Sequence, residues 1–245
     1  MFSILIMFGI YCWRMGLRLR GFAIIALGAI FVLNSGSKTT MGFLPIAIAL
    51  VLFGRALGRP RLILLGHGAL VLLIAALTVG TVFSPALLQL ASALTSDPTF
   101  TGRDEIWRFA SAHIGEKPWL GHGYFSFWQT PLVTALEENF EARWDIRGIG
   151  SAHNSYLDAM LMFGLPGAML VIFCLMILPL RNYLRAQRDP ARQKLADLFV
   201  MIVIFMTYVG MLESFFLNRA DPLWLLFALA VLGLELASRL RTKAV

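Results

Sequence analysis

The sequence predicts an all-α protein: a polytopic bundle of transmembrane helices with one large external loop that carries short amphipathic helices. Its composition is 58% hydrophobic and only 14% charged, whereas roughly a quarter of residues are charged in soluble proteins. The mean hydropathy is +0.75. Apolar runs recur along the whole chain, each bounded by arginine clusters or polar loops, which is typical of a multi-pass membrane protein. We therefore expect a single membrane domain over residues 1–245.

About seven apolar runs are predicted to span the membrane, and the segment 84–154 is predicted to form the external loop. The spans lie near residues 2–13, 21–34, 41–54, 62–83, 155–180, 196–216 and 223–238. The first has about 12 apolar residues, which as a helix cover roughly 18 Å of a hydrocarbon core about 30 Å thick. Two interpretations follow: the chain is the C-terminal portion of a longer protein, or its first helix is unusually short or tilted.

Basic residues gather on one side of the predicted bundle, in the turns around Arg14 and Arg55, in the loop 181–194 and in the C-terminal tail. By the positive-inside rule this side is cytoplasmic. The loop 84–154 therefore faces outward, to the periplasm if the cell is Gram-negative. The net charge of +7 follows this orientation, so membrane lipid is an expected partner and nucleic acid is not.

Neither a disulfide nor a metal site is predicted. Cys12 and Cys174 both fall in predicted spans, and the sequence has no CxxC pair. The external loop has three histidines, His113, His122 and His153, but none of them shows the HExxH or HxH spacing of a metal site. The sequence gives no sign of a cofactor.

A short amphipathic helix is predicted in the external loop, opened by a capping box of Thr101 and Asp104 and ended by Pro118. Its apolar face carries Ile106, Phe109, Ala110, His113 and Ile114. Arg103 falls in the first turn, where the helix macrodipole disfavours a cation. It is either a solvated surface charge or, together with nearby helix amides, part of an anion site.

The second candidate is His153, which the spacing places at the outer mouth of the fifth span. Histidine as a residue type titrates near neutrality and is therefore suited to proton transfer at a water-filled membrane surface. Asn154 follows it directly, and Asp158 comes about one helical turn later. We expect both to support the histidine.

Two aromatic residues of the loop, Trp107 and Tyr124, are candidate substrate contacts. Tryptophan and tyrosine are apolar on the ring face and polar at the tip, which suits them to sugar rings. The same properties favour an aromatic belt at the membrane interface. The sequence leaves both interpretations open.

Two charged residues complete the set of candidates. Arg147 could help to hold phosphate, or it could be the ion-pair partner of Asp145 or Glu141. Glu213 is predicted near the outer end of the sixth span, where an acidic side chain is costly and tends to face a cavity or a partner. It could pair with Arg219, or it could orient the hydroxyl groups of an acceptor sugar.

Four segments resemble the O-antigen ligase and polymerase superfamily, and most closely its rhizobial-type exopolysaccharide polymerase branch. These segments are SGSKTT, TGRDEIW, PWLGHGYFSFW and AHNSYLDAMLMFGLPG. The resemblance covers about residues 34–180. Its most specific piece is the HN pair followed after nine residues by GxxG, and the lysine turn is its weakest.

The resemblance implies a polytopic, GT-C-like glycosyltransferase in the bacterial inner membrane. We expect it to be inverting, because attack opposite the leaving group inverts the anomeric centre, and metal-independent, because the histidines lack the spacing of a metal site. Its donor would be a glycan on undecaprenyl pyrophosphate, its acceptor another glycan, and a chain-length regulator is a further partner that the resemblance allows. The family histidine corresponds to His153, as the base, and its loop arginine to Arg103. The second family cation is usually arginine but is Lys38 here, which keeps the charge and loses the bidentate fork.

The leading hypothesis is a polymerase that joins lipid-linked repeat units into exopolysaccharide or O-antigen. Within the family the alternative is a ligase that transfers a finished glycan to lipid A core. A flippase or permease, the alternative from another class, would need polar residues through several spans. Here the predicted spans contain almost no charged residues, and the polar residues are concentrated in the external loop. This distribution favours an enzyme that acts at the outer membrane surface.

Overall fold

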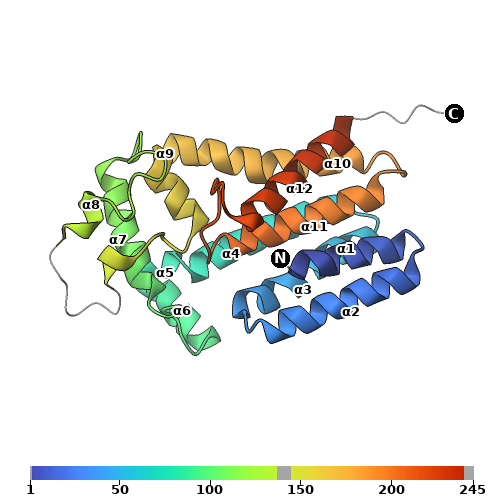
Figure 1. Cartoon of the computed structure of the whole chain (residues 1–245), viewed down its shortest axis with the longest axis horizontal. Helices are drawn as coiled ribbons and strands as arrows, with labels where there is room; N and C mark the ends of the chain where they lie inside the picture. Colours follow the sequence, from blue (N-terminus) through green and yellow to red (C-terminus); the bar gives the residue numbers. More distant parts are fainter. Residues whose placement is uncertain (1, 137–144, 240–245) are drawn as a thin grey trace. The chain divides into compact units, whose positions relative to one another are not determined.

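The computed structural model describes residues 2–136 and 145–239, and its regular elements in these ranges are all helices. The prediction of an all-α protein is thereby confirmed (Figure 1). The described residues form two compact units. The first comprises Met1–Ala69, Cys174–Val209 and Leu217–Val245, and the second comprises Leu70–Phe173 and Gly210–Phe216.

The first unit is a helical bundle arranged around α11. Its helices are α1 (Phe2–Arg14), α2 (Arg18–Asn34), α3 (Lys38–Ala56), α10 (Leu178–Ala186), α11 (Gln193–Val209) and α12 (Pro222–Arg239), and α4 (Pro60–Leu77) begins in it. α11 packs against α1, α3, α10 and α12. It is apolar around its whole circumference and buried from Leu198 to Val209 apart from Phe199, as expected for a central helix.

One carboxylate ties four helices of this unit together. Asp197 of α11 is fully buried and lies 2.8 Å from the Arg14 guanidinium of α1 and 3.3 Å from that of Arg55 on α3. From α10 and its C-cap it accepts hydrogen bonds from the Tyr183 hydroxyl and the Gln187 amide, both at 2.9 Å. A buried charge is tolerated when it is paired and hydrogen-bonded in this way.

The second unit contains most of the predicted external loop and the start of the following apolar helix. Its elements are α5 (Gly80–Phe83), α6 (Pro85–Leu94), α7 (Arg103–Glu116), α8 (Pro131–Thr134), the 3-10 helix η1 (Ile146–Gly148) and α9 (Ser155–Ile172). Side chains of α7, α9 and the loops between them share one core, made of Trp107, Ala110, Phe127, Val133, Ala152, Leu157 and Leu161. This core fixes α7 against α9.

Four helices are long and apolar enough to cross a membrane: Lys38–Ala56, Pro60–Leu77, Ser155–Ala186 and Pro222–Arg239. The third of these runs from α9 through the π-helix η2 (Phe173–Ile177) into α10. The protein is therefore a multi-pass membrane protein. Each predicted span overlaps an apolar helix, while the count of seven spans and the single membrane domain stay predictions.

Two of the predicted span boundaries are wrong. The predicted span 62–83 breaks after Leu77, and α5 begins separately at Gly80. The predicted span 196–216 ends at Val209, and Gly210–Phe216 belongs to the second unit. Met211, Leu212, Phe215 and Phe216 continue the apolar pattern on either side of Glu213 and Ser214. Ser155, however, bonds to backbone groups of Gly210, Glu213 and Phe215, and these bonds replace those of another helical turn.

Replacement of Asp197 by Ala should destabilise the first unit strongly, because it leaves two guanidinium groups and two polar side chains without their shared acceptor. Loss of one partner of a buried pair costs about 3–5 kcal/mol, and the partial exposure of Arg14 and Arg55 favours the lower end. The apparent melting temperature of the full chain in detergent measures the loss. Asp189→Ala, which removes a partly exposed partner of Arg192, is the control and should cost less. Equal losses in the two variants would contradict this role of Asp197.

Candidate functional site

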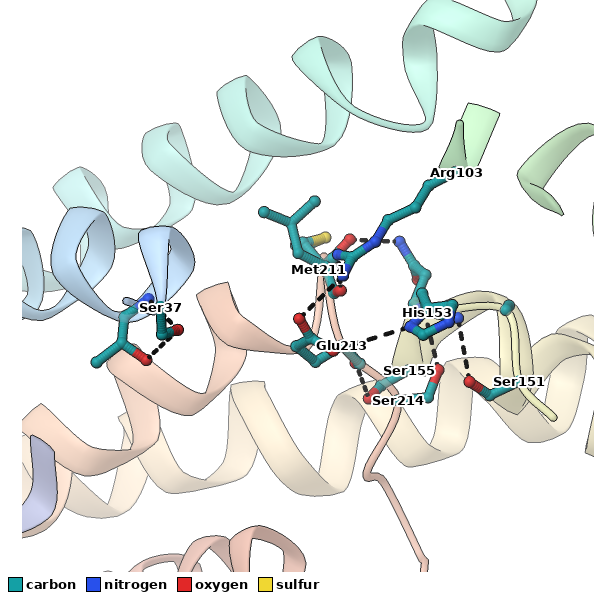
Figure 2. A network of polar contacts seen from close by, with 12 residues as sticks. Ser37, Arg103, Ser151, His153, Ser155, Met211, Glu213 and Ser214 are labelled. Atoms are coloured by element: carbon teal, nitrogen blue, oxygen red, sulfur yellow. Dashed lines mark hydrogen bonds and ion pairs between the residues drawn. The ribbon is translucent and has the colours of Figure 1, made fainter. Parts of the chain in front are cut away.

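Three polar side chains from distant parts of the sequence meet in the second unit, as Figure 2 shows. The Arg103 guanidinium donates to Glu213 Oε1 at 3.1 Å and to the carbonyl of Leu212. Nδ1 of His153 lies 3.9 Å from Glu213 Oε2, which is beyond hydrogen-bond length but within ion-pair range. One carboxylate thus lies between a cation and an imidazole.

The three side chains are partly open to solvent. The exposed fractions are 21% for the side chain of Arg103, 39% for that of His153 and 40% for that of Glu213. Of the five N–H donors of a guanidinium, Arg103 uses two in these bonds. The site is therefore built into the protein but remains reachable by a substrate.

Arg103 is positioned by a turn that Asp97 organises. Oδ1 of Asp97 accepts from the amide and hydroxyl of Thr99, and Oδ2 accepts from the amide of Thr101 at 2.7 Å. The turn has left-handed backbone at Thr101 (φ 63°) and Gly102 (φ 83°), and α7 begins directly after it at Arg103. The predicted capping box was wrong, because Gly102 is the N-cap and no side chain caps the helix.

The other features predicted for this helix are confirmed. Arg103 is its first residue, and the predicted apolar face is its buried face, with Ile106 at 1% and Ala110 at 0% exposure. The amides of Gly102 and Asp104, however, already donate to Thr99. An anion at this helix end would therefore rely on the guanidinium more than on free helix amides.

His153 is held by the start of α9. Its backbone is left-handed (φ 48°), which is uncommon for a residue other than glycine. Asn154 follows as the N-cap of α9, and its side-chain oxygen accepts from the amides of Tyr156 and Leu157. Capping by asparagine fixes the direction in which the chain enters the helix, so the imidazole is aimed by the cap beside it.

Asn154 and Ser155 also bind the segment 210–216, and we call this set of hydrogen bonds the α9 clamp. The side chain of Asn154 donates to the Met211 carbonyl at 2.9 Å, and its amide donates to the Ser214 hydroxyl at 2.9 Å. Ser155 donates its hydroxyl to the Glu213 carbonyl and its amide to the Gly210 carbonyl, both at 2.8 Å. The clamp therefore fixes the backbone that carries Glu213.

Asp158 supports the same region from inside α9. Its Oδ1 accepts from Nε1 of Trp128 at 2.8 Å and from the amide of Ala152 at 3.0 Å. These bonds link the segment before His153 and the aromatic loop to α9.

The electrostatics of Glu213 are set by its two neighbours. Burial by itself raises the pKa of this carboxyl, but the imidazole of His153 and the guanidinium of Arg103 outweigh burial and lower the pKa below its ordinary value. The guanidinium that Glu213 contacts is that of Arg103 and not, as one sequence interpretation had it, that of Arg219. The carboxylate is therefore ionised at neutral pH.

Residues 22–172 match the sequence model of a family described as O-Antigen ligase. The match covers more than half of the 245 residues and includes Arg103 and His153. The chain belongs to the O-antigen ligase family. No curated protein matches it significantly.

Membership of the O-antigen ligase family indicates membrane glycosyltransferase activity of the O-antigen ligase or polymerase type. It implies a lipid-linked glycan donor and a glycan acceptor in a membrane. Glu213 lies outside the matched residues, and the fold brings it next to Arg103 and His153. Glu213 was a candidate from the sequence, but Asp97, Trp128, Ser155 and Ser214 were not, although the turn-forming SDPTFTG segment around Asp97 was a usable signal.

The two aromatic candidates of this family member lie in different environments. Trp107 is fully buried, and its Nε1 donates to the Ala152 carbonyl at 3.1 Å. Its ring has no exposed face for a sugar in this structure, so it acts on the site by tying α7 to the residue before His153. Tyr124 is 41% exposed, with Phe125 edge-on and Phe163 stacked beside it.

The two remaining basic candidates are Arg147, in the second unit, and Lys38, in the first. Arg147 forms a two-point ion pair with Asp145 at 2.8 Å, and its guanidinium lowers the pKa of that carboxyl. Glu141, its other predicted partner, lies outside the described residues. Lys38 is the exposed first residue of α3, after the N-cap Ser37. It belongs to the first unit, and its part in the site stays a prediction.

Chemically, the site combines an anion-binding group with a group that can accept a proton. Guanidinium suits phosphate oxygens, and imidazole is the commonest general base in proteins. Within residues 2–136 and 145–239, no group of three or more His, Cys, Asp and Glu side chains could hold a metal ion. The arrangement suits a reaction in which an anion leaves and a hydroxyl proton is removed.

The stability contributed by Glu213 should depend on pH. Because its folded-state pKa is lowered, this contribution is present above the ordinary carboxyl pKa of about 4.3. It is lost as the pH falls through the lowered value. Apparent melting temperatures of the parent and Glu213→Gln proteins, compared from neutral to acidic pH, should differ at neutral pH and converge below about pH 4. A difference that persists undiminished at the most acidic pH would contradict this electrostatic role.

Proposed function

We propose that this protein is a membrane glycosyltransferase that joins polyprenyl-pyrophosphate-linked glycan repeat units, as a polymerase of exopolysaccharide or O-antigen. The observation that carries the proposal is the placement of the Glu213 carboxylate between Arg103 and His153 in a member of the O-antigen ligase family. The family indicates the class of reaction. The three side chains provide a cation for the departing pyrophosphate and a base for the proton of the acceptor hydroxyl.

The proposed step is a displacement at the anomeric carbon of the donor sugar. The acceptor hydroxyl gives its proton to His153 while its oxygen forms the new bond to the anomeric carbon. The bond from that carbon to the pyrophosphate oxygen breaks, and its electron pair leaves with the polyprenyl pyrophosphate. Attack opposite the leaving group inverts the anomeric centre. Nδ1 of His153 faces Glu213, so Nε2 is the nitrogen assigned to the proton.

Arg103 and Glu213 have complementary tasks in this step. Arg103 neutralises charge that develops on the departing pyrophosphate, and preorganised cations of this kind are among the largest contributions to catalysis. Glu213 holds the guanidinium in place and stabilises the imidazolium that forms when His153 takes the proton. At 3.9 Å this attraction is available without a change in the backbone.

The remaining candidates are assigned either to substrate binding or to positioning of the site. Lys38 is proposed as a second cation for the pyrophosphate and Arg147 as a third. Tyr124 has an exposed ring and is proposed as a platform for a sugar. Asn154 and Asp158 are proposed as positioning residues, because their polar atoms bind the protein itself. The enzyme would act on the outer face of the bacterial inner membrane.

Replacement of His153 by Ala in the full-length protein should reduce the rate of glycan transfer by at least about 10²-fold, because positioned general base catalysis contributes 10²–10⁴-fold. The measurement is the pattern of lipid-linked intermediates in cells that carry only the variant. Accumulated single repeat units support a polymerase. Accumulated long lipid-linked chains instead indicate a ligase that transfers finished glycan.

A matched histidine provides the control for this variant. His113 lies on α7, and its Nδ1 is bonded to the Phe109 carbonyl of the same helix. His113→Gln should leave the glycan pattern near that of the parent protein. Normal glycan output from His153→Ala would overturn both enzyme interpretations.

Replacement of Arg103 by Lys tests the guanidinium separately from the charge. Lysine keeps the positive charge but loses the fork that matches phosphate and carboxylate oxygens. We expect kcat/KM for the lipid-linked donor to fall by about 10²-fold, the usual loss when one preorganised donor is removed. Arg108→Lys, on the exposed face of the same helix, should change it little. Equal effects in the two variants would remove Arg103 from the site.

A further inference from the structure

α9 has a break that divides it into two parts with different surroundings. At Gly164 the backbone leaves the helical conformation (φ 66°, ψ −176°), so the element is two helices joined by a kink. In the first part, from Ser155 to Phe163, every side chain is buried or half-buried. After the break large apolar side chains are exposed, namely Leu165 (40%), Met169 (64%), Leu170 (63%) and Phe173 (48%).

The loop that contains Trp119 and Leu120 is docked into this break through its backbone. The amides of His122 and Gly123 donate to the carbonyls of Leu161 and Met162, and the amide of Leu165 donates to the Pro118 carbonyl. These bonds satisfy backbone amide and carbonyl groups that lose their helical hydrogen-bond partners at the kink.

The docking requires glycine on both sides of the junction. A Cβ on Gly164 would lie 2.5 Å from the carbonyl of Trp119, and one on Gly121 would lie 2.6 Å from the Gly164 amide nitrogen. The contact is backbone against backbone, which leaves the side chains of the loop free to point outward.

The side chains that point outward at the break are large and apolar. Trp119 is 72% exposed and Leu120 is 85% exposed, and Tyr124 (41%) and Phe125 (54%) follow closely. A group of exposed apolar side chains that includes tryptophan and tyrosine is typical of a membrane interface.

The length of the helix after the break indicates where this interface lies. The apolar helix Ser155–Ala186 has 32 residues, which is about 48 Å and more than a bilayer core of about 30 Å needs. The apolar part after the break, from Leu165 to Leu180, has 16 residues, or about 24 Å, and the basic Arg181 follows it, so a core of about 30 Å that begins at Arg181 ends within about one helical turn of the break. Gly164 therefore marks the natural outer edge of the hydrocarbon layer.

We propose that Trp119, Leu120 and Phe125 form a membrane anchor whose side chains insert into the outer edge of the lipid bilayer at the level of Gly164. The partner is the lipid surface itself, at the boundary between acyl chains and headgroups. The first part of α9 then rises from this surface and carries His153 at its end. Nine residues of helix place Ser155 at most about 14 Å above the edge, and His153 lies two residues before it.

The test measures the depth of single spin labels in the full chain reconstituted in lipid nanodiscs. Cys12 and Cys174 are replaced by Ala, and a nitroxide is attached at Leu120→Cys. The control label is at Ala112→Cys, on the exposed polar face of α7 with Arg108 and Glu116. Power saturation by oxygen, which concentrates in lipid, is compared with saturation by a water-soluble nickel complex.

The anchor predicts that oxygen relaxes the label at position 120 more than the nickel complex does, and that the order reverses at position 112. A label at 120 that is relaxed more by nickel would overturn the proposal, because the loop would then lie in water. Protection from both reagents would also overturn it, because a protein contact would cover the segment. An oxygen preference at both positions would contradict a boundary at Gly164. Unchanged melting temperatures of the labelled variants establish that each is folded, and Phe125→Cys repeats the test at a second position.

Discussion

The arrangement of the site depends on the α9 clamp, the hydrogen bonds by which Asn154 and Ser155 hold the segment 210–216. Both residues are almost completely buried, with 1% and 0% exposure, so water competes little for their bonds. The same asparagine also caps α9 with its side-chain oxygen. One pair of residues therefore decides where the helix begins and where Glu213 lies. Because Glu213 and the Leu212 carbonyl hold Arg103, the clamp determines the positions of all three polar side chains.

Local hydrogen bonds explain how strained backbone persists beside both Arg103 and His153. Thr101 lies two residues before Arg103, and it and His153 have left-handed φ angles of 63° and 48°. Each such residue costs on the order of 1–3 kcal/mol and persists only where its surroundings fix it. Asp97 fixes the turn at Thr101. The backbone at His153 is fixed by the Asn154 cap on one side and by the bond from the Ala152 amide to Asp158 on the other. The strain lies where it aims a side chain, which agrees with a functional site.

The sequence was sufficient for most of the helices and for naming the three central residues as candidates, but not for the way they meet. Long apolar runs mark helices because few other structures satisfy backbone groups in lipid, and Arg103 and His153 stand beside helix starts that local patterns reveal. The end of α11 was missed because Met211, Leu212, Phe215 and Phe216 continue the apolar pattern around Glu213, and the bonds from the distant Ser155 that replace the helical ones leave no local signal. The pairing of Arg103 with Glu213 joins residues 110 positions apart, and no local rule selects it over the nearby Arg219. Trp107 looked like a sugar platform because residue type and spacing do not report burial.

The charge of Glu213 has a clear consequence for the order of events at the site. Before substrate binds, the carboxylate offsets the guanidinium of Arg103, so the site does not hold an uncompensated buried cation. In the proposed mechanism, a pyrophosphate that approaches Arg103 brings negative charge close to Glu213, and negative charge favours cationic groups nearby. His153, at 3.9 Å from the carboxylate, is the proposed proton acceptor. The proposed leaving group and proton acceptor are thus coupled through a single carboxylate.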